Sequence, residues 1–202
     1  MVIVNNITIS ERESPPRMTT LVETDRLFLN PTLADDWRIR REIRHRLEAA
    51  TNHLPNDLCF MIYEAFRSRQ RQHTLWTPVY DRLKRENPDW SDAALYTETA
   101  RWVSPPDGFG SGHQAGAAID ISLAMRDRTP LDMGTKMQEF TALTPTDAPV
   151  LREIRTRRAL MTTALAREGL INYPDEWWHF SYGDRLWAEI TGKPSAFFAP
   201  LE

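Results

Sequence analysis

The feature that most constrains this chain is residues 111–123, a short segment in which polar side chains interrupt a run of small and apolar residues. It reads Ser-Gly-His-Gln-Ala-Gly-Ala-Ala-Ile-Asp-Ile-Ser-Leu, so His113 and Asp120 stand seven residues apart. Asp120 lies in a β-prone, apolar run, where an unpaired carboxylate would be costly to bury. A bound metal ion would remove that cost, because carboxylates are metal ligands.

A second segment supplies the remaining donors. Glu176-Trp-Trp-His179 follows a turn signal at Tyr173-Pro-Asp175. A single histidine is more often a hydrogen-bonded core or surface residue, but two histidines and an aspartate make three ligands. Catalytic zinc sites hold three protein ligands and leave the fourth position to water. The sequence therefore predicts one zinc ion per chain, bound by His113, Asp120 and His179, with Glu176 free to act as a general base.

These motifs occur together in a known order. Ser111-x-His113-x-x-Gly116-x-Ala118-x-Asp120 followed by Glu176-x-x-His179 resembles the paired signature of zinc D-alanyl-D-alanine dipeptidases of the VanX type. More widely, it resembles the metallopeptidases built like D,D-carboxypeptidases and the hedgehog signalling domain. Glu64-Ala-Phe-Arg67 is similar to the family's strand ending in Tyr-Arg, and Leu131-Asp-Met-Gly-Thr135 to its substrate-side loop. The resemblance runs from about residue 58 to 190.

The resemblance implies roles for further residues. Arg67 matches the arginine that stabilises the oxyanion, although Arg69 and Arg71 lie close to it in the sequence. Ser111 is expected to bind a substrate carboxylate, with a simple turn residue as the alternative. The family has an aspartate that binds the free ammonium group of the dipeptide where this chain has Gln138, which is neutral. The neighbouring Glu139 could substitute only if its side chain points the same way.

The expected fold class is α+β, with a small, mainly antiparallel sheet flanked by helices, because the chain lacks a regular βαβ rhythm. The resemblance implies the same D,D-peptidase/hedgehog-like fold. We expect one domain over residues 1–202, with an N-terminal strand and helix region (1–57) and a catalytic core (58–190). We expect strands at 2–9, 27–29, 58–66, 117–123, 170–173 and 177–182, and helices at 33–50 (capped by Thr32, with a solvated arginine-rich face), 70–86, 91–103, from about 147 to 168, and from 184.

Composition excludes several other classes. A net charge of -3 offers no basic patch for nucleic acid. No stretch approaches the roughly 18 apolar residues of a membrane span. The start of the chain lacks the features of a secretory signal, so a cytoplasmic location is the expectation. Cys59 is the single cysteine, which rules out an internal disulfide, and its apolar surroundings favour an inert core thiol.

The leading hypothesis is a zinc metallopeptidase that cleaves D-alanyl-D-alanine, a small peptide of D-amino acids. A D,D-carboxypeptidase or L,D-endopeptidase acting on longer cell-wall peptides is the alternative within the enzyme class, and Gln138 is what raises it. A zinc-stabilised binding module without catalysis is the alternative from another class. The presence of Glu176 and Arg67 speaks against that last reading, because a purely structural site needs neither.

Overall fold

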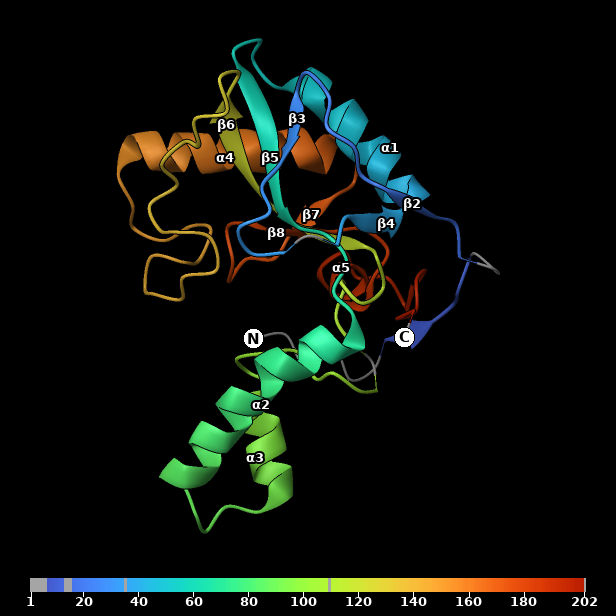
Figure 1. The fold of residues 1–202 in the computed structure, drawn as a ribbon, viewed down its shortest axis with the longest axis vertical. Helices are drawn as coiled ribbons and strands as arrows, with labels where there is room; N and C mark the ends of the chain where they lie inside the picture. Colours follow the sequence, from blue (N-terminus) through green and yellow to red (C-terminus); the bar gives the residue numbers. More distant parts are fainter. Residues whose placement is uncertain (1–6, 13–15, 35, 109, 202) are drawn as a thin grey trace.

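The computed structural model describes residues 7–12, 16–34, 36–108 and 110–201. Over this part of the chain, helices and strands intermix around one five-stranded sheet, which confirms the predicted α+β class (Figure 1). In chain order the elements are β1 (Thr8–Ile9), β2 (Met18–Thr20), β3 (Leu27–Leu29), β4 (Arg38–Arg40), α1 (Arg41–Ala50), a 3-10 turn (Thr51–His53), β5 (Leu58–Glu64), α2 (Arg69–Glu86), α3 (Asp92–Thr99), β6 (Ala118–Met125), α4 (Arg152–Arg167), β7 (Ile171–Asn172), β8 (His179–Ser181), α5 (Arg185–Ile190) and β9 (Ser195–Ala196).

The sheet has the strand order β3-β5-β6-β8-β7. Strand β3 pairs with β5 in parallel, and the other three pairings are antiparallel, so the sheet is mainly antiparallel as predicted. Strand β6 lies at its centre and is buried along almost its whole length. Its small and β-branched residues suit a strand that is covered on both faces.

The register of this sheet sets the position of three polar side chains. Asp120 on β6 stands opposite His179 on β8 and opposite Glu64 on β5. The pairing between β5 and β6 shifts between Ile62 and Glu64, which brings Glu64 opposite Asp120. Directly opposed residues have Cβ atoms about 5 Å apart. The three side chains therefore form a row across the middle of the sheet.

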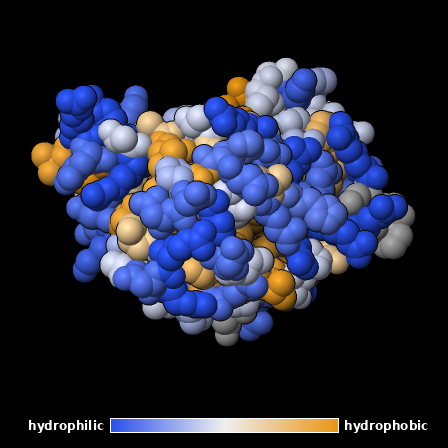
Figure 2. All heavy atoms as spheres, turned by 90° about the horizontal axis from the view of Figure 1, so that it is seen from above, coloured by the Kyte–Doolittle hydropathy of each residue, from blue (hydrophilic) through white to orange (hydrophobic). Residues whose placement is uncertain are grey.

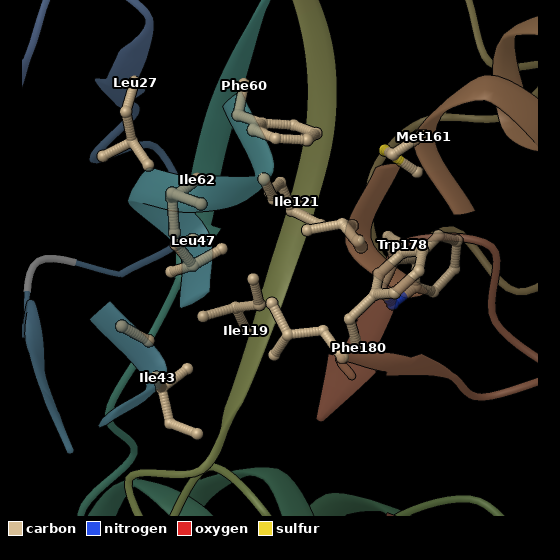
Figure 3. Packing of buried hydrophobic residues seen from close by; sticks show 14 of the residues in the cluster. Leu27, Ile43, Leu47, Phe60, Ile62, Ile119, Ile121, Met161, Trp178 and Phe180 are labelled. Carbon is tan, nitrogen blue, oxygen red and sulfur yellow. The ribbon is translucent and has the colours of Figure 1, made fainter. Parts of the chain in front are cut away.

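The main hydrophobic core lies between the sheet and the helices α1 and α4. Leu47 from α1 and Met161 from α4 pack with Ile119 and Ile121 of β6 (Figure 3). Side chains alternate between the two faces of a strand, so Asp120 points away from the face that carries Ile119 and Ile121. The apolar residues on either side of Asp120 thus anchor the strand in the core while its carboxylate faces the site.

Helices α2 and α3 form a unit that projects from the rest of the molecule, at the bottom of Figure 1. We call residues 69–103 the helical arm. Ser68 and Ser91 cap the two helices by accepting hydrogen bonds from backbone N–H groups of the first turn. The rings of Trp76 and Tyr96 join them, with centroids 5.2 Å apart. Both predicted helices are confirmed, although the second ends at Thr99 rather than near Val103.

The helix predicted from Leu33 to Ala50, with Thr32 as its cap, is wrong in its first half. Residues 38–40 form β4, which pairs with β2, and the helix begins only at Arg41. The solvated face predicted for its arginines is also wrong at Arg40. This side chain is fully buried, donates to the carbonyl of Ala115 and forms an ion pair with Glu11. Pairing with β2 therefore overrides the local helical pattern.

The surface in Figure 2 is mostly hydrophilic, with hydrophobic atoms showing in small separate patches. Burial of Cys59 confirms the interpretation of this thiol as a core residue. None of the helices in the described ranges has the length and hydrophobicity that crossing a bilayer requires.

Candidate metal centre

A tight turn before β6 presents the first histidine. Backbone hydrogen bonds from Ala115 to Ser111 and from Ala117 to Gly112 fold residues 111–117 back on themselves. Gly112 has no space for a side chain, since a Cβ atom there would collide with the carboxylate of Asp184 and with Ala118. The backbone of Gly112 therefore approaches Asp184 and Ala118 more closely than a residue with a side chain could.

The structure brings His113, Asp120 and His179 together, and all three are buried. His113 Nε2 lies 3.2 Å from His179 Nδ1 and 3.3 Å from Asp120 Oδ1. His179 Nδ1 lies 3.1 Å from the same carboxylate oxygen. All the potential ligand atoms fall within 4.8 Å of one another. Two imidazoles and one carboxylate thus converge on a single point from two distant segments of the chain.

The protonation of His113 suits a ligand. Its Nδ1 lies 2.8 Å from the carbonyl oxygen of Ala65. Because a carbonyl can only accept, Nδ1 carries a proton, and Nε2 is the ring nitrogen that faces the cluster. This arrangement is the usual second contact of a metal-binding histidine, which fixes both the tautomer and the ring orientation.

The charges of the cluster also fit a divalent cation. Burial alone would raise the pKa of Asp120, but His113 and His179 hold it well below its ordinary value. The carboxylate is therefore ionised while almost fully buried, and it needs positive charge nearby. Zinc accepts imidazole nitrogen and carboxylate oxygen at roughly 2.0–2.2 Å and is commonly four-coordinate. The three donors fit zinc with one position left for a small molecule.

Glu176 lies in the turn between β7 and β8, three residues before His179. Its carboxylate accepts a hydrogen bond of 3.1 Å from the indole N–H of Trp178 and lines the same cavity as the three donors. Burial raises the pKa of Glu176, partly opposed by His179. A carboxylate whose pKa is shifted towards neutrality is suited to accept and return a proton.

Arg67 follows β5 and is held by a buried carboxylate. Its Nε and Nη2 donate to the two oxygens of Glu64 at 2.9 and 2.6 Å, and its Nη1 donates to Gln72 at 3.1 Å. Of the three arginines in this region, Arg67 lines the cavity, whereas Arg69 pairs with exposed Asp107 and Arg71 pairs with Glu64. The Glu64 contact raises the pKa of Arg67 despite its burial.

Gln138 enters the site through an unusual backbone conformation, with φ of 57°. Its side-chain amide donates to Asp120 Oδ2 at 2.8 Å and to Glu64 Oε2 at 2.7 Å. It therefore bridges the row of carboxylates and faces the oxygen of Asp120 that the histidines leave free. The neighbouring Glu139 is exposed and bonds to the backbone N–H of Lys136, so it does not take over this position.

Ser111 and the two tryptophans complete the inner surroundings. Ser111 lines the cavity, and its hydroxyl accepts a hydrogen bond from the backbone of Gln114. Trp177 is buried and donates to the hydroxyl of Thr135, as expected for a packing residue. Trp178 is also buried, but it contributes to the cavity wall.

A cavity of about 560 Å³ opens in front of the metal ligands. Glu176 and Arg67 line its inner end, and residues of the helical arm line another part of it. Sequence reasoning did not assign a role to Glu64, which carries the hydrogen-bond network behind the ligands. A signal existed, because Glu64 is an acidic residue at the end of an otherwise apolar strand, where an unpaired charge is costly.

Comparison with known proteins gives consistent matches. The family described as D-ala-D-ala dipeptidase matches residues 39–195. A D-alanyl-D-alanine dipeptidase of Synechocystis sp. is 36% identical over 88 residues, which is 38% of this chain and 36% of that protein. The D-alanyl-D-alanine dipeptidase of Escherichia coli is 28% identical over 124 residues, 61% of this chain and 54% of that protein. The matched segments thus span between about a third and a half of these relatives.

Two solved structures also align with the chain. One is a mutant of the vancomycin resistance D,D-pentapeptidase VanY with Zn(II), at 16% identity and a TM-score of 0.43, covering 96% of this chain and 97% of that one. The other is VanYB with D-Alanine-D-Alanine, at 17% identity and a TM-score of 0.43, covering 77% and 79%. The family match extends over more than three quarters of the sequence, from β4 to β9. The chain therefore belongs to the D-ala-D-ala dipeptidase family.

Proposed function

We propose that this protein is a zinc-dependent peptidase that hydrolyses the peptide bond of D-alanyl-D-alanine. The observation that carries the proposal is the convergence of His113, Asp120 and His179 within 4.8 Å, beside Glu176 and at the inner end of a cavity. Membership of the dipeptidase family supports the same reaction. The proposed ligands are these three residues, with one zinc ion per chain.

The ion, when bound, would supply an acidified water and polarise the scissile carbonyl. Glu176 takes the proton of the attacking water and passes it to the amino group of the departing D-alanine. The C–N bond breaks, and the water oxygen remains on the carbonyl carbon. The buried position of Glu176 supports this role, because its raised pKa favours holding the proton between the two steps.

Arg67 would stabilise the negative charge that develops on the carbonyl oxygen. A fixed guanidinium at the cavity wall acts in this way without having to reorganise. Glu64 and Gln72 hold three of its nitrogens, which supports a preset orientation. Ser111, at the start of the metal-binding turn, would bind the substrate's terminal carboxylate.

Two substrates differ only on the amino side of the bond. The free dipeptide is the first candidate, because both curated relatives are named D-alanyl-D-alanine dipeptidase. The second is a longer peptide that ends in D-alanyl-D-alanine, as for a carboxypeptidase. Gln138 favours the second, because a neutral amide that already donates to two carboxylates offers no charge to an ammonium group.

A substitution at Glu176 tests the reaction. The Glu176→Ala variant should keep about one zinc ion per chain and lose D-alanine release by at least about 10²-fold, because the general base is gone while the ligands remain. Zinc content and D-alanine release measure the two properties separately. Glu139→Ala removes a nearby exposed carboxylate and should leave the rate unchanged. Full activity in Glu176→Ala would refute the mechanism, and zinc-loaded protein without hydrolysis would favour a binding module.

A further inference from the structure

The cavity extends well beyond the metal centre. It is lined at one end by Glu176 and His179 and at another by the helical arm, within a single volume of about 560 Å³. A dipeptide of two alanines has about eleven non-hydrogen atoms, which at less than about 30 Å³ each occupy under about 330 Å³. The proposed dipeptide would therefore leave a large part of the cavity unfilled.

The wall contributed by the arm is mostly apolar, with Thr97 and Arg101 as its polar side chains. Leu75 and Val79 stand one turn apart on α2, so they share a face of that helix, and both line the cavity. Tyr96 from α3 and Trp102 after it line the same region. Alanine methyl groups cannot cover so wide an apolar wall, so its natural occupant is a larger apolar group.

Aromatic rings at this wall remain partly exposed, although the guanidinium of Arg82 lies over Trp102 and the ring of Trp76 packs on Tyr96. Trp102 is 53% exposed and Tyr96 is 45% exposed, and Phe140, which also lines the cavity, is 58% exposed. Phe140 meets Trp178 edge to face, with ring centroids 5.6 Å apart, and so connects this wall to the metal centre. Exposed aromatic surface in a cavity is typical of a binding site, because covering it releases water from both partners.

The acidic residues of the cavity also favour a substrate without a free ammonium group. Its acidic lining among the described residues consists of Asp120, Glu176 and Asp184. The first is a proposed ligand, the second the proposed base, and Asp184 caps α5 and accepts from Ser181. The amide of Gln138 is bonded to two carboxylates. These three carboxylates are thus engaged elsewhere, and the described lining offers no further carboxylate that could pair with a free ammonium group.

We propose that the helical arm forms a subsite for an apolar group on the amino side of the scissile bond, so that the substrate is an N-extended peptide ending in D-alanyl-D-alanine. This inference rests on the proposed function, in which the free carboxylate of the terminal D-alanine lies on the carboxyl side of the scissile bond. The hydrolysis is unchanged: water adds to the carbonyl carbon and D-alanine leaves with the proton. What the arm adds is recognition of the acyl group.

Release of D-alanine from four substrates tests the subsite. The zinc-loaded protein is given free D-Ala-D-Ala and its N-acetyl, N-hexanoyl and N-benzoyl derivatives. The kcat/KM should rise about tenfold from the acetyl to the benzoyl derivative, because the larger group contacts the aromatic wall. Trp102→Ala should remove most of that gain. Trp90→Ala is the matched control, since Trp90 is an exposed tryptophan of the same arm that does not line this cavity, and it should keep the gain.

The outcomes separate this inference from the proposed function. Rapid hydrolysis of free D-Ala-D-Ala with none of the acylated forms would overturn the subsite and leave the reaction standing. Hydrolysis of no substrate would refute the reaction, and binding to the zinc-loaded Glu176→Gln variant would then decide the subsite. The subsite is supported if N-benzoyl-D-Ala-D-Ala binds more tightly than N-acetyl-D-Ala-D-Ala and if Trp102→Ala removes this difference. Equal binding of the two derivatives overturns the subsite.

Discussion

Glu64 accepts the hydrogen bonds that hold the polar side chains next to the proposed metal site. Its fully buried carboxylate accepts hydrogen bonds from Arg67, Arg71 and Gln138. Burial would raise the pKa of Glu64, but Arg67 lowers it to about 2. Because Arg67 and Gln138 both reach the site, this carboxylate sets the positions of a proposed catalytic group and of the residue behind Asp120.

Replacing Glu64 should destabilise the fold far more than replacing a surface glutamate. Glu64→Gln leaves two arginines facing a neutral group, and breaking a buried pair costs about 3 kcal/mol or more. Glu23 is the matched control: its pKa is also lowered to about 2, by Arg128, but the pair is solvent-exposed. Glu23→Gln should cost at most about 1 kcal/mol. Urea unfolding at neutral pH measures both, and equal losses would contradict the role of burial.

The pH dependence of the same pair has a defined sign. The folded pKa of Glu64 lies below its ordinary value of 4.5, so its contribution to stability is complete above 4.5 and is lost as the pH falls through about 2. The stability difference between the wild type and Glu64→Gln should therefore shrink across this window. A difference that stays constant, followed by urea unfolding at several pH values, would show that the pair is not ionised in the folded state.

At the residue level, the sequence predicted that His113, Asp120 and His179 come together, because two short motifs carry all three. The contacts of Gln138 were not predictable. They need a non-glycine residue at φ of 57° and the register shift that brings Glu64 opposite Asp120. Neither leaves a recognisable local pattern, because a left-handed residue other than glycine is uncommon. The motif singled out Arg67 from Arg69 and Arg71, but the partners of the three guanidinium groups depend on the direction of each side chain.

At the level of elements, the turn before β6 determines where His113 lies. Gly112→Ala should lower zinc affinity by about tenfold or more, because the added methyl group collides with Asp184 and Ala118 and displaces the neighbouring His113. Gly192→Ala is the control, as Gly192 has φ of 65° with no atoms near its absent Cβ. Gly192→Ala should lower the free energy of unfolding by about 1 kcal/mol because of backbone strain, and it should leave the zinc affinity unchanged. Zinc titration decides, and normal affinity in Gly112→Ala would refute the steric argument.

The elements with strong local signals were predicted well. Strand β6, the arm helices and the β7–β8 pair follow clear apolar patterns bounded by turn or cap residues. The segment before Arg41 was predicted wrongly as a helix, because the spacing of its apolar residues also fits a helix. The segment forms a strand because it pairs with β2, about twenty residues earlier, and because Arg40 is buried against Ala115. Such long-range pairing is not encoded in the spacing of nearby residues.

At the level of the whole molecule, the proposed site joins segments that are distant in sequence. The residues before β5 contribute β3 to the central sheet, and Arg40 donates to the carbonyl of Ala115 in the metal-binding turn. His113 and His179 are 66 residues apart and meet only in the folded chain. A metal ion that needs both histidines can therefore bind only to the folded chain, and this couples metal affinity to folding.

Zinc should accordingly stabilise the folded protein. At a free zinc concentration about a hundred times Kd, the gain is about 2.7 kcal/mol, and for a chain of this size this corresponds to a rise in Tm of about 5–10 °C. A chelator should reverse the rise, as measured by calorimetry. His179→Ala removes one proposed ligand and should abolish most of the shift, whereas His45→Ala, at an exposed position on α1, should retain it. An equal shift in both variants would place the ion elsewhere, because only one of them touches the proposed centre.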